Sequence, residues 1–222
     1  MRIHPDGWKF VGLFAAVTLI FFLFSTALGW VGIILTAWCI YFFRNPERMT
    51  PTREGLIVSP ADGKVVGVKC VVPPKDFDMG DEARVRISIF LNVFDVHVNR
   101  LPVGGIIKKI IYHPGKFFNA SLDKASEHNE RNTLVIDLGE GRDLAVIQIA
   151  GLIARRIRCD VEEGDVVLTG QRYGLIRFGS RADIYLPRGA EAQVIEGQYM
   201  IAGETILADM TSTESMREGT YR

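Results

Sequence analysis

The first part of the chain is one long apolar run. No charged residue occurs between Lys9 and Arg44, and residues 10–43 are rich in Phe, Leu, Ile, Val and Trp. A single straight helix of that length would be about 50 Å long, because an α-helix rises about 1.5 Å per residue. The hydrocarbon core of a bilayer is only about 30 Å thick. The run is therefore long enough for membrane attachment but too long for one straight span.

A pair of apolar helices accounts better for this length. Gly29-Trp30 stands near the middle of the run, and a break there leaves two arms, residues 10–28 and 31–43. We therefore predict that residues 1–48 form an N-terminal hydrophobic helical hairpin that spans the membrane or is partly embedded in it. A secretory signal peptide, with an apolar region of about 7–15 residues, is a poorer match.

The charges at the two open ends of the hairpin predict its orientation. Arg2 and Lys9 precede the apolar run, and Arg44 and Arg48 follow it. Because positively charged flanks stay on the cytoplasmic side, both ends and the chain that follows are predicted to lie at the cytoplasmic face of the cell membrane. A hairpin buried in a soluble core is the alternative, and the density of Phe argues against it.

After residue 48 the pattern changes to short alternating or apolar segments, which are rich in Val and Ile and separated by Gly, Pro and Asp. This is typical of strands, and no convincing amphipathic helix follows. The predicted fold class is therefore mainly β, a barrel-like sandwich of short strands formed by residues 49–222. The clearest strand candidates are Val65–Val72, Arg84–Leu91, Leu134–Leu138, Leu144–Ile149, Asp165–Leu168 and Ala182–Leu186.

A weak internal repeat supports this architecture. The pattern V-x-E-G-x5-G occurs at residues 161–170 and again at 194–203. Two glycine-punctuated turns of this kind suggest a pseudo-twofold arrangement of small sheets, although similar turns are common in β proteins.

Composition excludes several classes of protein. The chain has 26 Lys and Arg against 26 Asp and Glu, so it lacks the basic excess typical of a nucleic-acid partner. Its three Cys form no CxxC pair, and its four His show no metal-binding spacing, so neither a disulfide framework nor a metal site is expected.

The first candidate for chemistry is the bond between Gly179 and Ser180, the only Gly-Ser pair in the chain. A serine hydroxyl can attack the preceding carbonyl and form an ester, and glycine leaves that carbonyl uncrowded. β-Elimination and hydrolysis would then leave a pyruvoyl group. Taken alone, the dipeptide is better explained as a turn before the strand Ala182–Leu186.

Other polar residues also have two interpretations. Asp62 lies in Ser59-Pro60-Ala61-Asp62-Gly63, which is either a β-turn or a source of a catalytic carboxylate. His97 shares a predicted strand face with Asp95 and Asn99, a polar stripe that either faces solvent or lines a site. The dense polar stretch that contains Asn119 and Arg131 is either a solvated loop or a headgroup-binding loop.

Taken together, several motifs resemble those of one family. In order they are Phe42-Phe43-Arg44-Asn45-Pro46, Ser59-Pro60-Ala61-Asp62-Gly63, the stretch around His97, Asn129-Glu130-Arg131-Asn132, and Gly170-Gln171-Arg172-Tyr173-Gly174 through Phe178-Gly179-Ser180. The chain resembles a phosphatidylserine decarboxylase proenzyme of the short bacterial and archaeal type, over nearly its whole length.

The resemblance implies self-cleavage between Gly179 and Ser180. Residues 1–179 would become the β chain, and residues 180–222 the α chain, blocked by a pyruvoyl group made from Ser180. The two chains would stay together as a heterodimer, and further assembly is left open. The pyruvoyl group would form a Schiff base with phosphatidylserine in the membrane and act as an electron sink for decarboxylation to phosphatidylethanolamine, with no metal.

The resemblance also implies roles for individual residues. Asp62 and His97 would act with Ser180 in a triad-like arrangement. Other branches of the family carry a second His where this chain has Arg100. Arg100 therefore becomes a candidate contact for the lipid headgroup, together with Asn119 and Arg131. Which of Asp62 and His97 serves self-cleavage and which serves decarboxylation stays open.

Three other functions remain to be separated from this one. The same chemistry could act on an ether-linked serine lipid. A membrane-anchored β-sandwich could bind or scaffold without catalysis. A lipid hydrolase could use Ser180, Asp62 and His97 as a nucleophilic triad. The last two predict that the chain stays intact.

Overall fold

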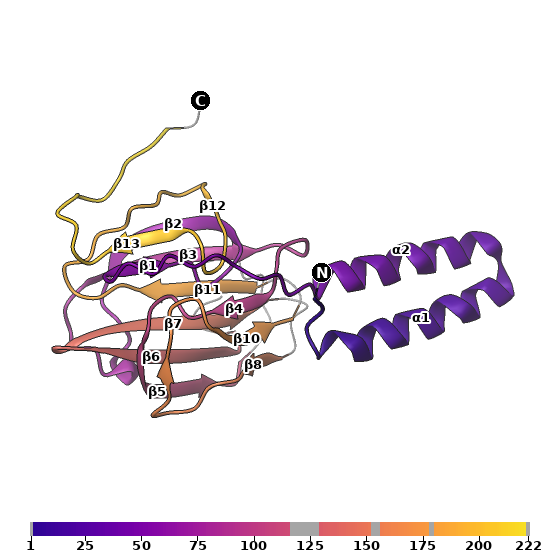
Figure 1. The fold of residues 1–222 in the computed structure, drawn as a ribbon, viewed down its shortest axis with the longest axis horizontal. Helices are drawn as coiled ribbons and strands as arrows, with labels where there is room; N and C mark the ends of the chain where they lie inside the picture. The colour runs from indigo at the N-terminus through magenta and orange to yellow at the C-terminus, as the bar shows by residue number, and fades with distance from the viewer. Residues whose placement is uncertain (1, 116–128, 152–155, 178–179, 221–222) are drawn as a thin grey trace.

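The computed structural model describes residues 2–115, 129–151, 156–177 and 180–220. It consists of a β domain with a pair of apolar helices that project from one end (Figure 1). The mainly β fold and the N-terminal helical pair predicted from the sequence are confirmed.

The β domain is built on an eight-stranded antiparallel sheet of order β12-β2-β3-β11-β7-β6-β5-β9. Strand β11 lies in its interior and pairs with β3 on one side and β7 on the other. The strands of this sheet are β2 (Gly63–Val71), β3 (Arg84–Leu91), β5 (Gly105–His113), β6 (Arg131–Gly139), β7 (Arg142–Ala150), β9 (Val166–Val167), β11 (Ser180–Tyr185) and β12 (Tyr199–Met200).

Two smaller sheets complete the domain. A three-stranded sheet has the order β4-β10-β8, and a two-stranded sheet pairs β1 with β13. A single 3₁₀ turn, η1 (Lys75–Phe77), is the only helix described after the helical pair. The strands are β1 (Leu56–Val58), β4 (Val98–Arg100), β8 (Ile157–Cys159), β10 (Arg172–Ile176) and β13 (Ile206–Asp209).

The largest hydrophobic cluster lies on one face of the large sheet. Ala182 and Ile184 of β11 are fully buried there, within a cluster that includes Ile89 of β3 and Val146 of β7. Alternate residues of a strand face opposite sides, so the β-branched and apolar residues that made these segments recognisable also form this core.

The internal repeat occupies equivalent places in the sheet. The N–H of Gly164 donates to the carbonyl of Ile107 in β5, and the N–H of Gly197 donates to the carbonyl of Val65 in β2, each at 2.8 Å. Both glycines have positive φ, 90° and 96°. The two copies lead into β9 and β12, which form the two opposite edges of the sheet. The two copies of the repeat thus form equivalent turns, each leading into one edge strand of the sheet.

The helical pair consists of α1 (Gly7–Phe24) and α2 (Thr26–Phe42). The predicted break at Gly29-Trp30 is wrong, because the chain turns at Ser25, whose backbone is extended. Gly29 instead lies inside α2, where a Cβ would come within 2.2 Å of the Phe22 ring. This glycine permits close helix packing and does not make a bend.

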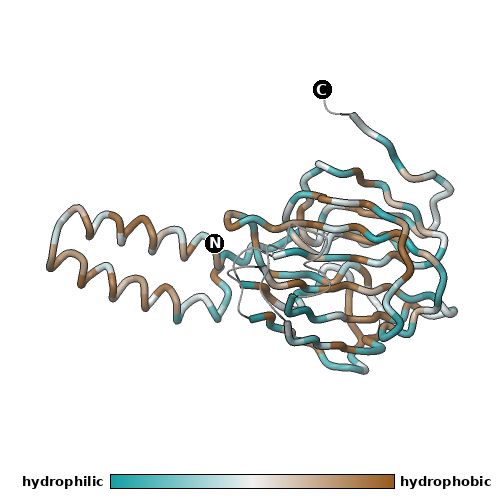
Figure 2. The backbone as a smooth tube through the Cα atoms, turned by 180° about the vertical axis from the view of Figure 1, so that it is seen from behind, coloured by the Kyte–Doolittle hydropathy of each residue, from teal (hydrophilic) through white to brown (hydrophobic). Residues whose placement is uncertain are grey.

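The helices are apolar along most of their length (Figure 2). They pack through small and hydroxyl residues, and the side chains of Thr18 and Thr36 share a hydrogen bond of 3.0 Å. Among the described residues, α1 is the one helix long and apolar enough to cross a membrane, and α2 is slightly shorter.

The packing of β5 against β6 gives a test of this fold. A Cβ at Gly105 would lie 2.4 Å from the carbonyl oxygen of Asp137, whereas a Cβ at Gly67 would have no neighbour closer than 4.0 Å. We expect Gly105→Ala to lower the free energy of unfolding by about 2 kcal/mol, because backbone must move to relieve the overlap. Gly67→Ala, the matched control, should change it by less than about 1 kcal/mol. Urea unfolding in detergent measures both, and equal effects would contradict the register.

Candidate active site

Ser180 is the first residue of β11, where it pairs with Leu91 of β3 and Ala150 of β7. It is fully buried, and its Oγ has no hydrogen-bond partner in the described part of the chain. Leaving a buried hydroxyl unpaired costs about 1–3 kcal/mol, so such groups are rare outside functional sites. Gly179 lies outside the described residues. Ser180 is thus buried between two strands, and no described residue holds its hydroxyl.

His97 is also fully buried, immediately before β4. Its Nδ1 lies 3.0 Å from the carbonyl oxygen of Asp95. A carbonyl only accepts, so Nδ1 carries the proton and Nε2 carries the lone pair. Burial lowers the pKa of His97 from 6.5 to about 4, despite the opposing effect of the Asp95 carbonyl. The ring is therefore neutral near pH 7, with Nε2 able to accept a proton.

The predicted polar strand face containing Asp95, His97 and Asn99 is wrong. Residues 93–95 form a turn and a bend, residues 96–97 are irregular, and the strand begins only at Val98. The carboxylate of Asp95 accepts from the N–H of Asn92 and from the hydroxyl of Tyr199. The backbone of Asp95, and not its side chain, therefore orients His97.

Strand β10 connects the surroundings of His97 with those of Ser180. The N–H of Ile176, at the end of β10, donates to the carbonyl of His97 at 3.2 Å. The Ile176 side chain packs against Ala150, which is paired with Ser180. Figure 1 shows β4, β10 and the beginning of β11 at the end of the domain that carries the helices. The start of β11 and the strand that follows His97 thus lie at the same end of the domain.

Asp62 lies in a tight turn directly before β2 and is nearly buried. Its carboxylate accepts two contacts from Arg48, at 2.9 and 2.7 Å, and one of 2.8 Å from the N–H of Ala202. Burial raises the pKa of Asp62, and the Ala202 N–H and the charge of Arg48 oppose that rise. The sequence suggested a β-turn or a functional carboxylate. The chain does bend here directly before β2, and a catalytic role for Asp62 stays a prediction.

A buried row of amides joins this turn to the sheet. Asn99 Nδ2 lies 3.5 Å from the carbonyl of Pro60, and its Oδ1 accepts from Gln148 of β7 at 2.9 Å. Gln148 in turn accepts from Asn132 of β6 at 3.2 Å. Sequence reasoning missed Gln148, whose signal is an amide within an otherwise apolar strand. Since buried polar groups need partners, this row fixes β4 against β7 and β6.

The three candidate headgroup contacts have different surroundings. Arg100 is buried, and its guanidinium donates to the carbonyls of Gly170 at 2.8 Å and Pro46 at 2.9 Å. Burial, followed by the nearby Arg172 and Arg48, lowers its pKa to about 10. Arg131 is half-buried at the start of β6, which β7 separates from β11. Asn119 lies outside the described residues. All three remain predictions.

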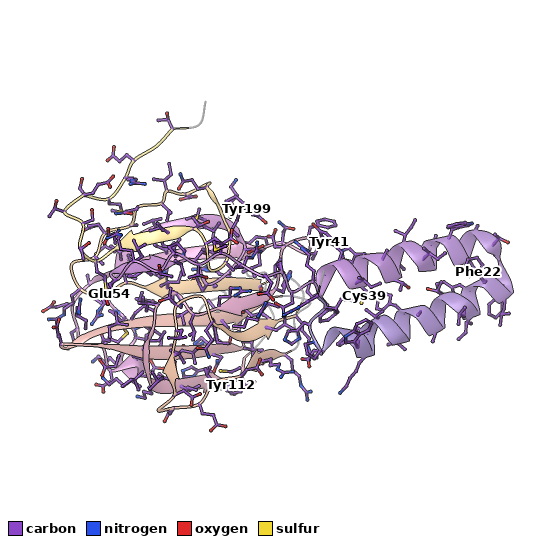
Figure 3. The ribbon with its side chains drawn as sticks, in the orientation of Figure 1. Phe22, Cys39, Tyr41, Glu54, Tyr112 and Tyr199 are labelled. Carbon is purple, nitrogen blue, oxygen red and sulfur yellow. The ribbon has the colours of Figure 1, made fainter. Side chains whose placement is uncertain are left out.

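Two tyrosines, Tyr41 and Tyr199, lie where the helical pair meets the β domain and on the β domain itself. Figure 3 shows Tyr41 and Cys39 near the base of the pair, Phe22 near its tip, and Tyr199 on the β domain. The Tyr199 hydroxyl donates to Asp95, and burial together with this bond raises the pKa of Tyr199. In the described ranges, no cluster of three or more His, Cys, Asp or Glu side chains is arranged to hold a metal ion.

Fold and candidate site together define a class, a β-sheet protein with an apolar helical extension, a buried serine at the start of an interior strand and a buried neutral histidine. Comparison with known proteins makes the class specific. The family model for phosphatidylserine decarboxylase matches residues 35–208. The chain belongs to the phosphatidylserine decarboxylase family.

Similar proteins cover almost the whole chain. A protein of Cereibacter sphaeroides named phosphatidylserine decarboxylase proenzyme is 60% identical, covering 99% of this chain and 95% of its own length. One of Ruegeria pomeroyi with the same name is 62% identical over 94% of this chain and 95% of its own length. A third relative, from Rhodospirillum rubrum and with the same name, is 58% identical over 100% of this chain and 94% of its own length.

The buried neutral His97 predicts a pH dependence of stability. Above pH 6.5 the ring is neutral in both states, whereas between 6.5 and about 4 only the unfolded chain takes up the proton. The free energy of unfolding should therefore fall as the pH drops through this window, by up to about 1.4 kcal/mol per pH unit from this group. We expect that slope to be smaller in His97→Gln, measured by urea unfolding with both chains carrying Ser180→Ala. Equal dependence of the unfolding free energy on pH in the two chains would contradict this role of His97.

Proposed function

We propose that this chain is a self-processing decarboxylase that converts phosphatidylserine to phosphatidylethanolamine. The observation that carries the proposal is the buried Ser180 hydroxyl without a described partner, at the Gly-Ser bond of a chain whose relatives are named proenzymes. Residues 1–48 are the membrane hairpin and 49–222 the catalytic domain. Cleavage between Gly179 and Ser180 yields a β chain, 1–179, and an α chain, 180–222.

The self-cleavage uses groups of this chain and one water molecule. Ser180 Oγ attacks the carbonyl carbon of Gly179, and His97 Nε2 takes the hydroxyl proton. The C–N bond breaks as the nitrogen of residue 180 gains a proton, which leaves an ester. Removal of the Cα proton of residue 180 then expels the Gly179 carboxylate and leaves dehydroalanine. Water hydrolyses its imine tautomer, which releases ammonia and leaves the pyruvoyl group, with no external oxidant.

Several features of the site suit this group. A pyruvoyl group at position 180 would replace a hydroxyl that the described residues leave unsatisfied, in a dry position between β3 and β7. When present, it takes up the substrate amine and supplies the electron sink for loss of the carboxylate. Asp62, held by Arg48 and Ala202, fixes the turn beside β4. Its raised pKa also favours a role in proton transfer.

The membrane helices suit a lipid substrate. The start of β11 lies at the end of the β domain from which α1 and α2 project, so a headgroup at the membrane surface would be near Ser180. The basic flanks of the hairpin favour the cytoplasmic face. Arg100, Asn119 and Arg131 are the proposed headgroup contacts. For Arg100 this requires exchange of at least one of its bonds to Gly170 and Pro46. Assembly of the α–β heterodimer into larger oligomers is open.

An intact-mass spectrum under denaturing conditions tests the proposal. We expect two species from the wild type, the smaller one being residues 180–222 with a blocked N-terminus. Ser180→Ala should give one uncut chain, because the nucleophile is gone. A single uncut wild-type mass after prolonged incubation would contradict the proposal and favour a scaffold or a triad hydrolase. Incubation with diacyl and ether-linked serine lipids then shows which of them releases carbon dioxide.

The pH dependence of cleavage tests the role of His97. Protonation of Nε2 removes the base, and the pKa of His97 is about 4. The first-order cleavage rate should therefore stay constant from pH 8 to about 5.5 and fall as the pH drops further. His97→Gln should slow cleavage by about 10²–10⁴-fold at pH 7. A rate that falls through pH 6.5, typical of an exposed histidine, would count against this assignment, and circular dichroism at each pH controls for unfolding.

A further inference from the structure

We propose that the base of the membrane hairpin is a clamp that positions the self-cleavage site, and we call Asp6, Phe10, Phe42 and Phe43 the hairpin clamp. This inference rests on the proposed cleavage at Gly179-Ser180. It gives the helices a role in maturation in addition to attachment.

The first arm of the clamp holds the chain just before the bond to be cut. Asp6 precedes α1, and its Oδ2 accepts a 2.7 Å hydrogen bond from Arg177 Nη2. The Arg177 guanidinium also lies 5.3 Å from the centre of the Phe10 ring. Arg177 directly follows β10 and stands two residues before Gly179. The start of α1 is therefore tied to the segment that enters the cleavage site.

The second arm reaches His97. The Phe42 ring lies 4.2 Å from the His97 ring, between centroids, and Phe43 packs edge-on against Phe42 at 5.1 Å. Phe43 in turn stacks on Phe10 at 5.2 Å. The aromatic side chains of the clamp thus form a continuous path from the proposed base to Phe10, the ring beside Arg177.

The clamp is closely packed. A Cβ at Gly7 would lie 2.5 Å from the Cβ of Phe43, so the first turn of α1 needs a glycine there. Backbone bonds of 2.8 Å join the N–H of His4 to the carbonyl of Phe43, and the N–H of Asn45 to the carbonyl of Arg2. The two open ends of the hairpin are therefore fixed to each other. Through Asp6 one end contacts Arg177, and through Phe42 the other contacts His97.

This position matters because the link to be cut is short. Only residues 178 and 179 separate Arg177 from Ser180, and three residue steps reach at most about 11 Å. Ser180 is fixed at the other end by β3 and β7. Intramolecular attack depends steeply on alignment, and a misplacement of about 1 Å can cost a hundredfold in rate. Loss of the tether at Arg177 should therefore slow attack by Ser180.

Asp6 offers a matched control, because its other oxygen, Oδ1, accepts a 2.5 Å bond from Arg158 of β8. The experiment follows cleavage of full-length precursor, freshly made by cell-free translation into detergent micelles, on denaturing gels over time. We expect Asp6→Asn and Arg177→Gln each to slow cleavage by about tenfold or more. Arg158→Gln, which removes the same kind of ion pair from the same carboxylate, should stay within about twofold of wild type.

Two further variants separate positioning from general stability. Asp6→Glu keeps the charge and should restore most of the rate. The double variant Asp6→Asn with Arg177→Gln should be no slower than the slower single variant, because both substitutions remove the same Asp6–Arg177 ion pair. The thermal unfolding midpoints should stay near that of the wild type, since partly exposed ion pairs contribute little to stability.

The outcomes also distinguish the clamp from the proposed function. If the wild type is cut and Asp6→Asn is cut at the same rate, the clamp is wrong and the function stands. Equal slowing by Arg158→Gln, or multiplying effects in the double variant, would likewise overturn it. If the wild type itself stays uncut, the proposed function fails first.

Discussion

The register of β11 is the constraint on which the rest of this structure depends. From Ser180 to Tyr185 every residue is paired with β3 on one side and β7 on the other. This double pairing buries Ser180 at a fixed point in the sheet and leaves little freedom for its backbone. A one-residue slip would move every side chain of β11 to the opposite face. The proposed nucleophile owes its position to the whole sheet and not to a local loop.

The far face of β11 reinforces that register. Arg181 and Asp183 are almost fully buried there and form an ion pair with bonds of 2.6 and 2.9 Å, while Arg181 also donates to Ser88 of β3. A buried ion pair adds little net stability, but breaking one is costly. In a slipped register these charges would enter the apolar core. The same strand would keep an α chain in the sheet after the proposed cleavage, assisted by β12 against β2 and β13 against β1.

Local patterns in the sequence predicted the parts of this fold that depend on local properties. The segment Arg84–Leu91 became β3 with the same bounds, because its Val, Ile and Phe side chains suit a buried pleated strand. The hairpin break was misplaced because glycine permits close packing as well as bending, and Gly29 serves packing against Phe22. Strand β5, with two lysines within its apolar residues, was not predicted at all.

The candidate site also has parts that local sequence motifs reveal and parts that they do not. Ser180, Asp62 and His97 could be named because they lie in short motifs that resemble a family. The Asp95 carbonyl that orients His97 could not, since the motif contains the side chain and the structure uses the backbone. Contacts between distant parts of the chain, such as Gln148 with Asn99, leave no trace in local periodicity. They follow from the register of the sheet, which one sequence alone does not reveal.

The segment between the helices and the β domain is bound to that domain along most of its length. Asn45 accepts from Arg172, the Pro46 carbonyl accepts from Arg100, and Arg48 binds Asp62. Thr50 packs so closely on Gly170 that a Cβ there would overlap its hydroxyl at 2.2 Å. A connection anchored at nearly every residue fixes the direction of the helices relative to Ser180. In the proposed membrane attachment, this connection would also set how the proposed site faces a lipid headgroup.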